Sequence, residues 1–356
     1  MASTEFIWHP EDAIKIVSMV VWNGRLWTGT LDGSLSMWDL PTPVEDEADA
    51  VTQMQDGWKR ALPRHHNNSV YCLTVLSERF LVSADDDGWL VVWSGSEGDP
   101  LPCCKQRGHL QAVTCVAAMA EGLFATGSRD GSLGLWGLDE ASGGAESLAA
   151  VQRQGASVHA LLCFDAGEGL VCTGTADGRV SCWQLARGSA VLLASAKKHT
   201  HIVTHLARVG DALASGSADH SVRLWDARSC RCLHVGSVSS KSITSMVSSS
   251  DGAILAVADL SGALALLDGR DLAARAHHSL HSGSVASAHL VGSFVFSVGR
   301  DGVVGKTDLR DPQRPPSLSS AGARVYQSVL WGCDVVVCLF SDQLSLGLFK
   351  AKETHS

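Results

Sequence analysis

Short apolar runs separated by turn residues dominate the chain. One example is the series Val113–Ala117, Leu123–Ser128 and Ser132–Trp136, in which the last two runs are separated by a turn that contains Asp130 and Gly131. An Asp-Gly pair between apolar runs is typical of a β-hairpin. A weaker fourth run follows in several places, and no segment shows the sustained apolar period of a helix. The pattern therefore predicts an all-β protein.

The hairpin pattern repeats along the whole chain. Five segments place an Asp six residues before a Trp, and these pairs are Asp32 and Trp38, Asp87 and Trp93, Asp130 and Trp136, Asp177 and Trp183, and Asp219 and Trp225. Three degenerate copies follow and end at Leu267, Thr307 and Leu348. The ends at Trp183, Trp225 and Leu267 are each 42 residues apart. Four strands in a unit of about 40–45 residues predict a propeller blade.

With these residues the chain resembles the WD-repeat β-propeller family, from about Phe6 to Lys350. The family signature is clearest in Gly216–Asp226. Four units also have the family's histidine four residues before the first strand, at His66, His109, His199 and His281. The resemblance implies that this His, a strand Ser or Thr, the turn Asp and the Trp form a buried, hydrogen-bonded tetrad. The tetrads assigned in this way are His66, Ser83, Asp87 and Trp93; His109, Thr126, Asp130 and Trp136; and His199, Ser215, Asp219 and Trp225.

Eight units predict eight blades of four antiparallel strands, in a single domain that spans residues 1–356. Seven blades are the alternative, in which one unit is irregular. Almost no chain follows the third strand of the last unit. The resemblance therefore implies that an N-terminal strand at about residues 4–8 closes the last blade. The long spacing between Trp38 and Trp93 accommodates an acidic loop insertion at about residues 41–66.

The composition excludes several classes of function. The chain has 28 Lys and Arg against 37 Asp and Glu, a formal net charge of −9, and no basic run. Direct nucleic-acid binding is therefore not expected, because it depends on neutralising phosphates. No stretch of about 18 apolar residues predicts a membrane span. The N-terminus lacks the pattern of a secretory signal. We expect a cytoplasmic or nuclear protein that is not secreted, with its 11 cysteines reduced.

The motifs predict no enzyme, no cofactor, no metal and no small-molecule substrate. The combination of His, Ser or Thr, and Asp superficially matches a catalytic triad, but it recurs in blade after blade, which is typical of a structural lock. The Cys and His clusters lack the matched pairs of a structural zinc site. These clusters are Cys230 with Cys232, Cys103 with Cys104, His65 with His66, and His277 with His278 and His281.

The remaining candidates lie at the turns. The resemblance implies that the loop before each first strand and the turn after each second strand share the usual partner-binding face. The residues predicted to bind a partner there are Arg129, Arg300, Arg324, Lys241, Asp86 and Trp89. The four cations would gather around one end of the central channel of the propeller and bind an acidic or phosphorylated segment. The alternative is that these cations are solvated and spread over a wide ring, and that Trp89 serves packing rather than binding.

We therefore expect a non-catalytic scaffold or adaptor that binds other proteins, several of them, within a multiprotein complex. Three alternatives stay open. One is a receptor for an acidic or phosphorylated peptide at the propeller face, another is a component of a ribonucleoprotein-assembly particle, and the last is a propeller enzyme with a non-repeating polar pocket. The fold leaves the choice open because the function of a propeller depends on its surface.

Overall fold

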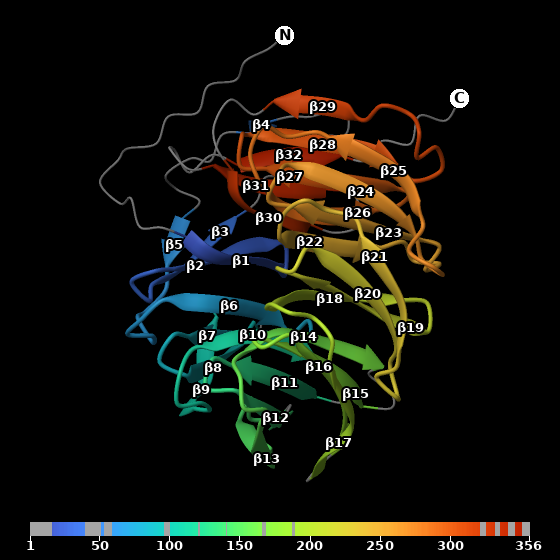
Figure 1. Cartoon of the computed structure of the whole chain (residues 1–356). Coiled ribbons are helices and arrows are strands. Elements are labelled where there is room, and N and C mark those ends of the chain that lie inside the picture. Colours follow the sequence, from blue (N-terminus) through green and yellow to red (C-terminus); the bar gives the residue numbers. More distant parts are fainter. Residues whose placement is uncertain are drawn as a thin grey trace.

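The computed structural model describes residues 16–39, 51–52, 59–95, 100–119, 122–139, 141–165, 169–186, 189–320, 325–331, 335–340 and 346–350. Over these residues the regular structure consists of β-strands (Figure 1). The predicted all-β class is confirmed. No helix within the described ranges has the length and apolar character needed to cross a membrane.

The described strands pair into eight antiparallel sheets of four strands, which we call blades one to eight in chain order. Blades one to four consist of β1 (Ile16–Trp22), β2 (Arg25–Thr30), β3 (Leu35–Asp39) and β5 (Lys59–Ala61); β6 (Val70–Val75), β7 (Phe80–Asp85), β8 (Trp89–Ser94) and β9 (Leu101–Arg107); β10 (Val113–Ala118), β11 (Leu123–Ser128), β12 (Ser132–Leu138) and β13 (Ala145–Arg153); and β14 (Val158–Asp165), β15 (Leu170–Thr175), β16 (Arg179–Ala186) and β17 (Ser189–Lys197).

Blades five to eight consist of β18 (Val203–Val209), β19 (Ala212–Ser217), β20 (Ser221–Asp226) and β21 (Cys232–Ser237); β22 (Ile243–Ser248), β23 (Ile254–Asp259), β24 (Ala263–Asp268) and β25 (Ala274–Ser279); β26 (Val285–Val291), β27 (Phe294–Gly299), β28 (Val303–Asp308) and β29 (Ser317–Ser320); and β30 (Val325–Trp331), β31 (Val335–Phe340), β32 (Leu346–Lys350) and β4 (Val51–Thr52). Strand pairing therefore gives eight sheets, the first of the two counts that the sequence allowed.

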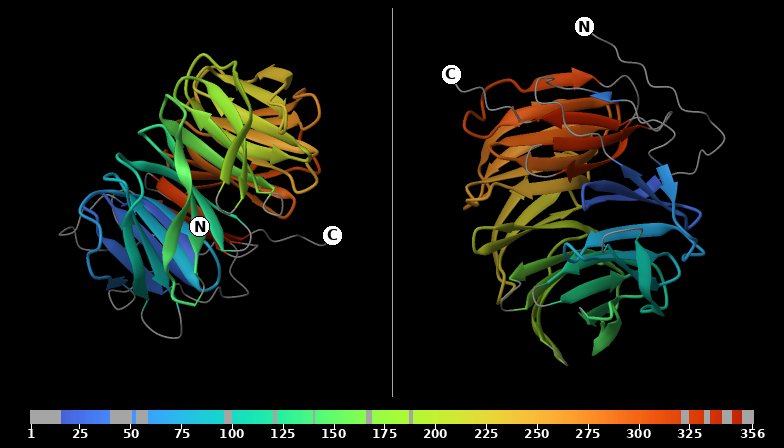
Figure 2. Two further views of the ribbon diagram at one scale, coloured as in Figure 1. Left: turned by 90° about the horizontal axis from the view of Figure 1, so that it is seen from below. Right: turned by 180° about the vertical axis from the view of Figure 1, so that it is seen from behind.

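The first strands of neighbouring blades contact one another all the way round, and β30 of blade eight contacts β1 of blade one. The red strands β30 and β31 accordingly lie beside the blue strands of blade one (Figure 1), and the view from behind agrees (Figure 2). A closed ring leaves no first strand without a neighbour, which limits the exposed sheet edges that promote aggregation.

The fourth strand of blade eight comes from an unexpected part of the chain. β4 pairs with β32 through Thr52 opposite Leu346 and Val51 opposite Gly347. The strand predicted at residues 4–8 lies outside the described residues. The acidic loop insertion predicted at about residues 41–66 is not a loop throughout, because it contains both β4 and β5, the latter paired with β3 of blade one. β4 consists of the β-branched residues Val51 and Thr52, which favour a strand.

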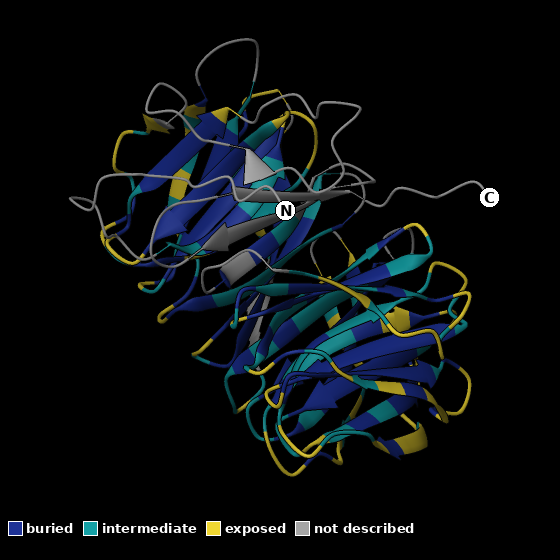
Figure 3. Ribbon diagram, turned by 90° about the horizontal axis from the view of Figure 1, so that it is seen from above, coloured by how far each residue is buried: buried dark blue, intermediate teal, exposed yellow. Residues whose placement is uncertain are grey.

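The core lies between the blades. The middle strands are buried over most of their length, whereas outer strands such as β9 and β17 alternate between exposed and half-buried residues (Figure 3). Phe124 and Trp136 of blade three stack with their ring centroids 6.1 Å apart and pack against Val82 of blade two. Such large buried side chains dominate the free energy of core packing.

The predicted turns between second and third strands require a left-handed residue. Gly88 has a φ of +84°, and a Cβ placed there would lie 2.2 Å from the carbonyl oxygen of His109. Glycine is therefore required by both conformation and space. In blade five the corresponding residue is His220, with a φ of +70°.

Candidate functional site

The predicted tetrad of blade five is present. His199 Nδ1 lies 2.9 Å from Asp219 Oδ2, and His199 Nε2 lies 2.7 Å from Ser215 Oγ. The indole Nε1 of Trp225 donates to the same hydroxyl at 2.7 Å. This tetrad, which we call the lock, therefore connects the loop before a blade to the second and third strands of that blade through one buried hydroxyl.

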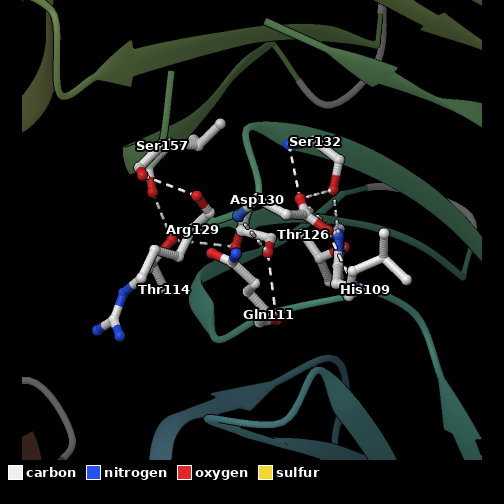
Figure 4. Close-up of polar contacts among 12 residues, drawn as sticks. His109, Gln111, Thr114, Thr126, Arg129, Asp130, Ser132 and Ser157 are labelled. Carbon is white, nitrogen blue, oxygen red and sulfur yellow. Dashed lines mark hydrogen bonds and ion pairs between the residues drawn. The ribbon is translucent and has the colours of Figure 1, made fainter. Parts of the chain in front are cut away.

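Blade three contains the same lock, except that a serine side chain lies between the histidine and the acid. His109 Nε2 lies 2.6 Å from Thr126 Oγ1, which also accepts from Trp136 Nε1 at 2.8 Å. His109 Nδ1 lies 2.6 Å from Ser132 Oγ and 4.0 Å from Asp130, and Ser132 in turn donates to Asp130 (Figure 4). The serine thus connects the histidine to the carboxylate.

The predicted tetrad of blade two contains an error. His66 Nδ1 lies 2.8 Å from Asp85 Oδ2 and not against Asp87. Ser83 and Trp93 complete the lock as expected, with Trp93 Nε1 donating to Ser83 Oγ at 2.8 Å. Asp87 is exposed and accepts from Asn68 Nδ2 at 3.3 Å. Asp85 is the acid of this tetrad because it ends the buried strand β7, from which its carboxylate reaches the imidazole of His66.

Other blades keep only part of the lock. In blade four, Trp183 Nε1 donates to Thr173 Oγ1 at 3.1 Å, and that hydroxyl donates to Gln154 Oε1 at 2.8 Å. Gln154 thus takes the place of the histidine, which sequence spacing did not reveal. In blade seven, His281 Nε2 lies 2.9 Å from Ser297 Oγ.

The electrostatics of these locks fit a structural role. Burial lowers the pKa of His109 to about 4, against the smaller opposing effect of Asp130. Burial likewise lowers the pKa of His199, although Asp219 opposes it. Burial alone would raise the pKa of Asp219, but hydrogen bonds from Ser221 and from the N–H of Thr200 hold it well below its ordinary range. A buried polar group of this kind is stable only when it is hydrogen-bonded.

The turns and the loops share one face of the ring. The N–H of Arg129, just before the turn of blade three, donates to the carbonyl of Ala112, just before the first strand, at 2.8 Å. The same bond joins Asp86 to Ser69, Ala176 to Ser157, Ala218 to Ile202, Leu260 to Ser242, and Arg300 to Ser284. We call the residue in this position the pre-turn residue, and we call this side of the ring the turn face.

Two predicted residues meet on the turn face. Arg129 Nη1 lies 3.6 Å from Asp86 Oδ1, so the pre-turn residues of blades two and three form an ion pair. The Arg129 side chain extends away from His109 and Ser132 (Figure 4) and is 54% exposed. Burial and the nearby charge of Arg129 both lower the pKa of His159, on β14 of blade four. His159 therefore lies near Arg129, and the repeat pattern did not predict this position.

The other predicted residues are more dispersed. Arg300 is the pre-turn residue of blade seven and Lys241 lies in the loop before blade six, and both are exposed. In a ring of eight, blades three and seven stand on opposite sides, so Arg129 and Arg300 are not neighbours. Arg324 lies outside the described residues. Trp89 is half-buried on β8, and Lys105 Nζ lies 5.1 Å from its ring centroid.

Large apolar side chains also reach solvent on the turn face, and the sequence analysis did not single them out. They are the pre-turn residue Leu260, Leu31 just before the turn between β2 and β3, and the loop residue Leu110, which is 61% exposed. Within the described ranges, no group of three or more His, Cys, Asp or Glu side chains is arranged to hold a metal ion.

Comparison with known proteins agrees with this geometry. The family model described as "WD domain, G-beta repeat" matches residues 59–94, 101–137 and 191–226. No curated protein matches the sequence significantly. The chain is similar to the solved structure of Sqt1 from Saccharomyces cerevisiae, with 17% identity, a TM-score of 0.79, and coverage of 96% of this chain and 97% of that chain.

Two further solved structures are similar. Sqt1 from Chaetomium thermophilum, bound to the N-terminus of the ribosomal protein L10, has 18% identity and a TM-score of 0.75, covering 93% of this chain and 94% of that one. The computationally designed protein Ika8 has 20% identity and a TM-score of 0.76, covering 95% and 96%. The matched repeats, the tetrads and the ring of sheets together support a WD-repeat β-propeller.

Proposed function

We propose that this propeller is a non-catalytic adaptor that binds protein segments on its turn face within a multiprotein complex. The observation that carries the proposal is a contrast between equivalent positions. The buried locks of blades two, three and five are all built from a histidine, a hydroxyl residue, an acid and a tryptophan. The pre-turn residues, which share one geometry, differ in chemistry and are Asp86, Arg129, Ala176, Ala218, Leu260 and Arg300.

The exposed pre-turn residues have the chemistry expected of a protein-binding surface. Leu260 is 49% exposed, although the same position is filled by alanine in blades four and five. The fold therefore does not require a large apolar group there. Large contiguous apolar patches mark protein-interaction sites, and we assign Leu260, with Leu110 and Leu31 on other blades, to the apolar part of the binding surface.

The similarity to Sqt1 supports a protein segment as the partner, because one Sqt1 structure holds the N-terminus of a ribosomal protein. It also favours a second candidate, a role in assembling a ribonucleoprotein particle. In that case binding would be to a protein component, because a chain of net charge −9 has little capacity to neutralise RNA phosphates.

The test is purification of tagged protein from native cells with mass spectrometry of stoichiometric partners. We compare wild type with Leu260→Glu on the turn face and with Leu318→Glu on the outer strand β29, where the leucine is similarly exposed. The adaptor proposal expects partners to be lost with Leu260→Glu and kept with Leu318→Glu. A wild-type protein that purifies alone as a monomer would contradict it.

The receptor for an acidic or phosphorylated peptide makes a different prediction. Charge reversal of Arg300 and Lys241, whose blades are neighbours, would then abolish binding of the copurifying partner. Arg129→Glu would act less strongly, because Asp86 already neutralises this cation. Retention of every partner by all three variants excludes the acidic-segment receptor and leaves the apolar residues as the determinants. Fractionation of the same tagged cells tests the predicted cytoplasmic or nuclear location.

A further inference from the structure

Three cysteines from two blades meet in one buried cluster. Cys182 of β16 lies at its centre, with its sulfur 3.3 Å from that of Cys172 on β15 and 3.1 Å from that of Cys230. Cys230 belongs to the turn between β20 and β21 of blade five. All three side chains are buried in the apolar core where blades four and five pack together. The cluster takes no part in the proposed binding face.

We propose that Cys182 and Cys230 form a site of reversible disulfide modification that covalently joins blade four to blade five when the protein meets a small-molecule disulfide. The two sulfurs need to approach by only about 1 Å to reach a disulfide bond length of about 2.05 Å. Cys172 and Cys182 are cross-strand neighbours within blade four. A bond between them would not connect two blades.

Cys230 is the thiol through which the modification enters. Its turn, Asp226–Arg231, lies at the surface, and Arg228, Ser229 and Arg231 are exposed while the Cys230 side chain is turned inward. The backbone φ of Cys230 is +50°, a left-handed conformation that strains a residue with a Cβ. Opening of this short turn relieves that conformation and brings the thiol to solvent.

The closed cluster protects the thiols. The hydrogen bond between Cys230 and Cys182 raises the pKa of Cys230, and burial raises it further. Opening of the turn would expose the Cys230 thiol near its sequence neighbours Arg228 and Arg231, whose positive charges favour the reactive thiolate. The modification therefore depends on opening of the turn rather than on unfolding of the propeller.

The exchange is balanced. The Cys230 thiolate attacks the small disulfide, forms a mixed disulfide and releases one small thiolate, which takes up the proton that Cys230 lost. As the turn closes, the Cys182 thiol gives up its proton and attacks the Cys230 sulfur, and the second small thiol leaves. Two protein thiols are oxidised by two electrons, and one small disulfide is reduced to two thiols.

The experiment incubates folded, full-length protein with oxidised glutathione and maps disulfides by mass spectrometry after blocking free thiols. Wild type is compared with Cys230→Ser and with the matched control Cys172→Ser. We expect a Cys182–Cys230 cross-link in wild type and in Cys172→Ser and none in Cys230→Ser. The cross-link should raise the midpoint of thermal unfolding by roughly 5 °C in the first two proteins only.

Exposed Cys103 provides an internal control for the reagent. The proposal is overturned if Cys103 is glutathionylated while Cys182 and Cys230 stay reduced in folded wild type. It is also overturned if the cross-link appears only in denaturant, or if Cys172–Cys182 is the product instead.

Discussion

Asp85 Oδ2 lies 2.8 Å from His66 Nδ1, and both side chains are withdrawn from solvent. The other oxygen of the same carboxylate accepts the N–H groups of Asp87 and Trp89 at 3.0 and 2.8 Å. In blades one, three and five the same strand-end position is filled by a hydroxyl residue, at Thr30, Ser128 and Ser217. In blade two the acid of the lock therefore lies two residues closer to the N-terminus than in blades three and five. It still bonds to the histidine and to the N–H groups of the turn.

This relationship predicts different effects for two similar substitutions. Asp85→Asn should lower the free energy of unfolding by about 2–4 kcal/mol, because the amide puts an NH2 donor in place of one of two buried carboxylate oxygens that both form hydrogen bonds. Asp87→Asn, in the exposed turn, should change it by less than about 0.5 kcal/mol. Urea denaturation of the two variants beside wild type measures both values. Equal losses would mean that the carboxylates share the role.

The same blade shows how far the sequence could lead. The spacing between Asp and Trp correctly placed the locks of blades three and five, because their turns contain a single acid. Blade two has three successive acids, and only the reach of each carboxylate to His66 decides among them. Pairing between distant segments is equally invisible to a local pattern, as the contact of Cys182 with Cys230 and the pairing of β4 with β32 demonstrate.

The buried histidines predict loss of stability in acid. The pKa of His109 is about 4 in the folded protein, whereas an unfolded chain has the ordinary value of 6.5. The unfolded chain therefore binds the proton first. The stabilisation is complete above pH 6.5 and is lost as the pH falls toward 4. His205 and His289, which burial also brings to about 4, act in the same direction.

His109→Gln tests this linkage, since Gln154 already fills the equivalent position in blade four. From pH 7.5 to pH 5, the variant should lose about 2 kcal/mol less unfolding free energy than wild type, because it lacks one titrating group. Urea unfolding at both values measures the difference. The control is His234→Gln, which removes an exposed imidazole. An unchanged pH dependence in His109→Gln would show that this histidine titrates normally.

Blade seven predicts a stabilising substitution. Thr307 stands ten residues after Ser297, where the other locks have Trp, and its buried hydroxyl has no hydrogen-bond partner within the described structure. Thr307→Val keeps the shape and removes the unsatisfied group, so it should raise the free energy of unfolding by about 1 kcal/mol. Thr126→Val, which loses its contacts with His109 and Trp136, should lower it by about 2–3 kcal/mol. A destabilising Thr307→Val would reveal a partner for the hydroxyl.

The turn of blade five predicts a second gain. His220 adopts a φ of +70° where Gly131 and Gly178 have +82° and +84°. A residue with a Cβ is strained there, and the glycine that relieves the strain also gives the unfolded chain more freedom. His220→Gly should therefore raise the free energy of unfolding by about 0.5–1 kcal/mol, the balance of the two effects. Gly178→Ala is the opposite test, because the Cβ of the alanine would lie 2.1 Å from the carbonyl oxygen of His199. This substitution should lower the free energy of unfolding by about 2 kcal/mol or more, because the backbone must shift to accommodate the Cβ. If thermal and urea unfolding instead show His220→Gly to be destabilised, the exposed imidazole must stabilise the turn through its own contacts.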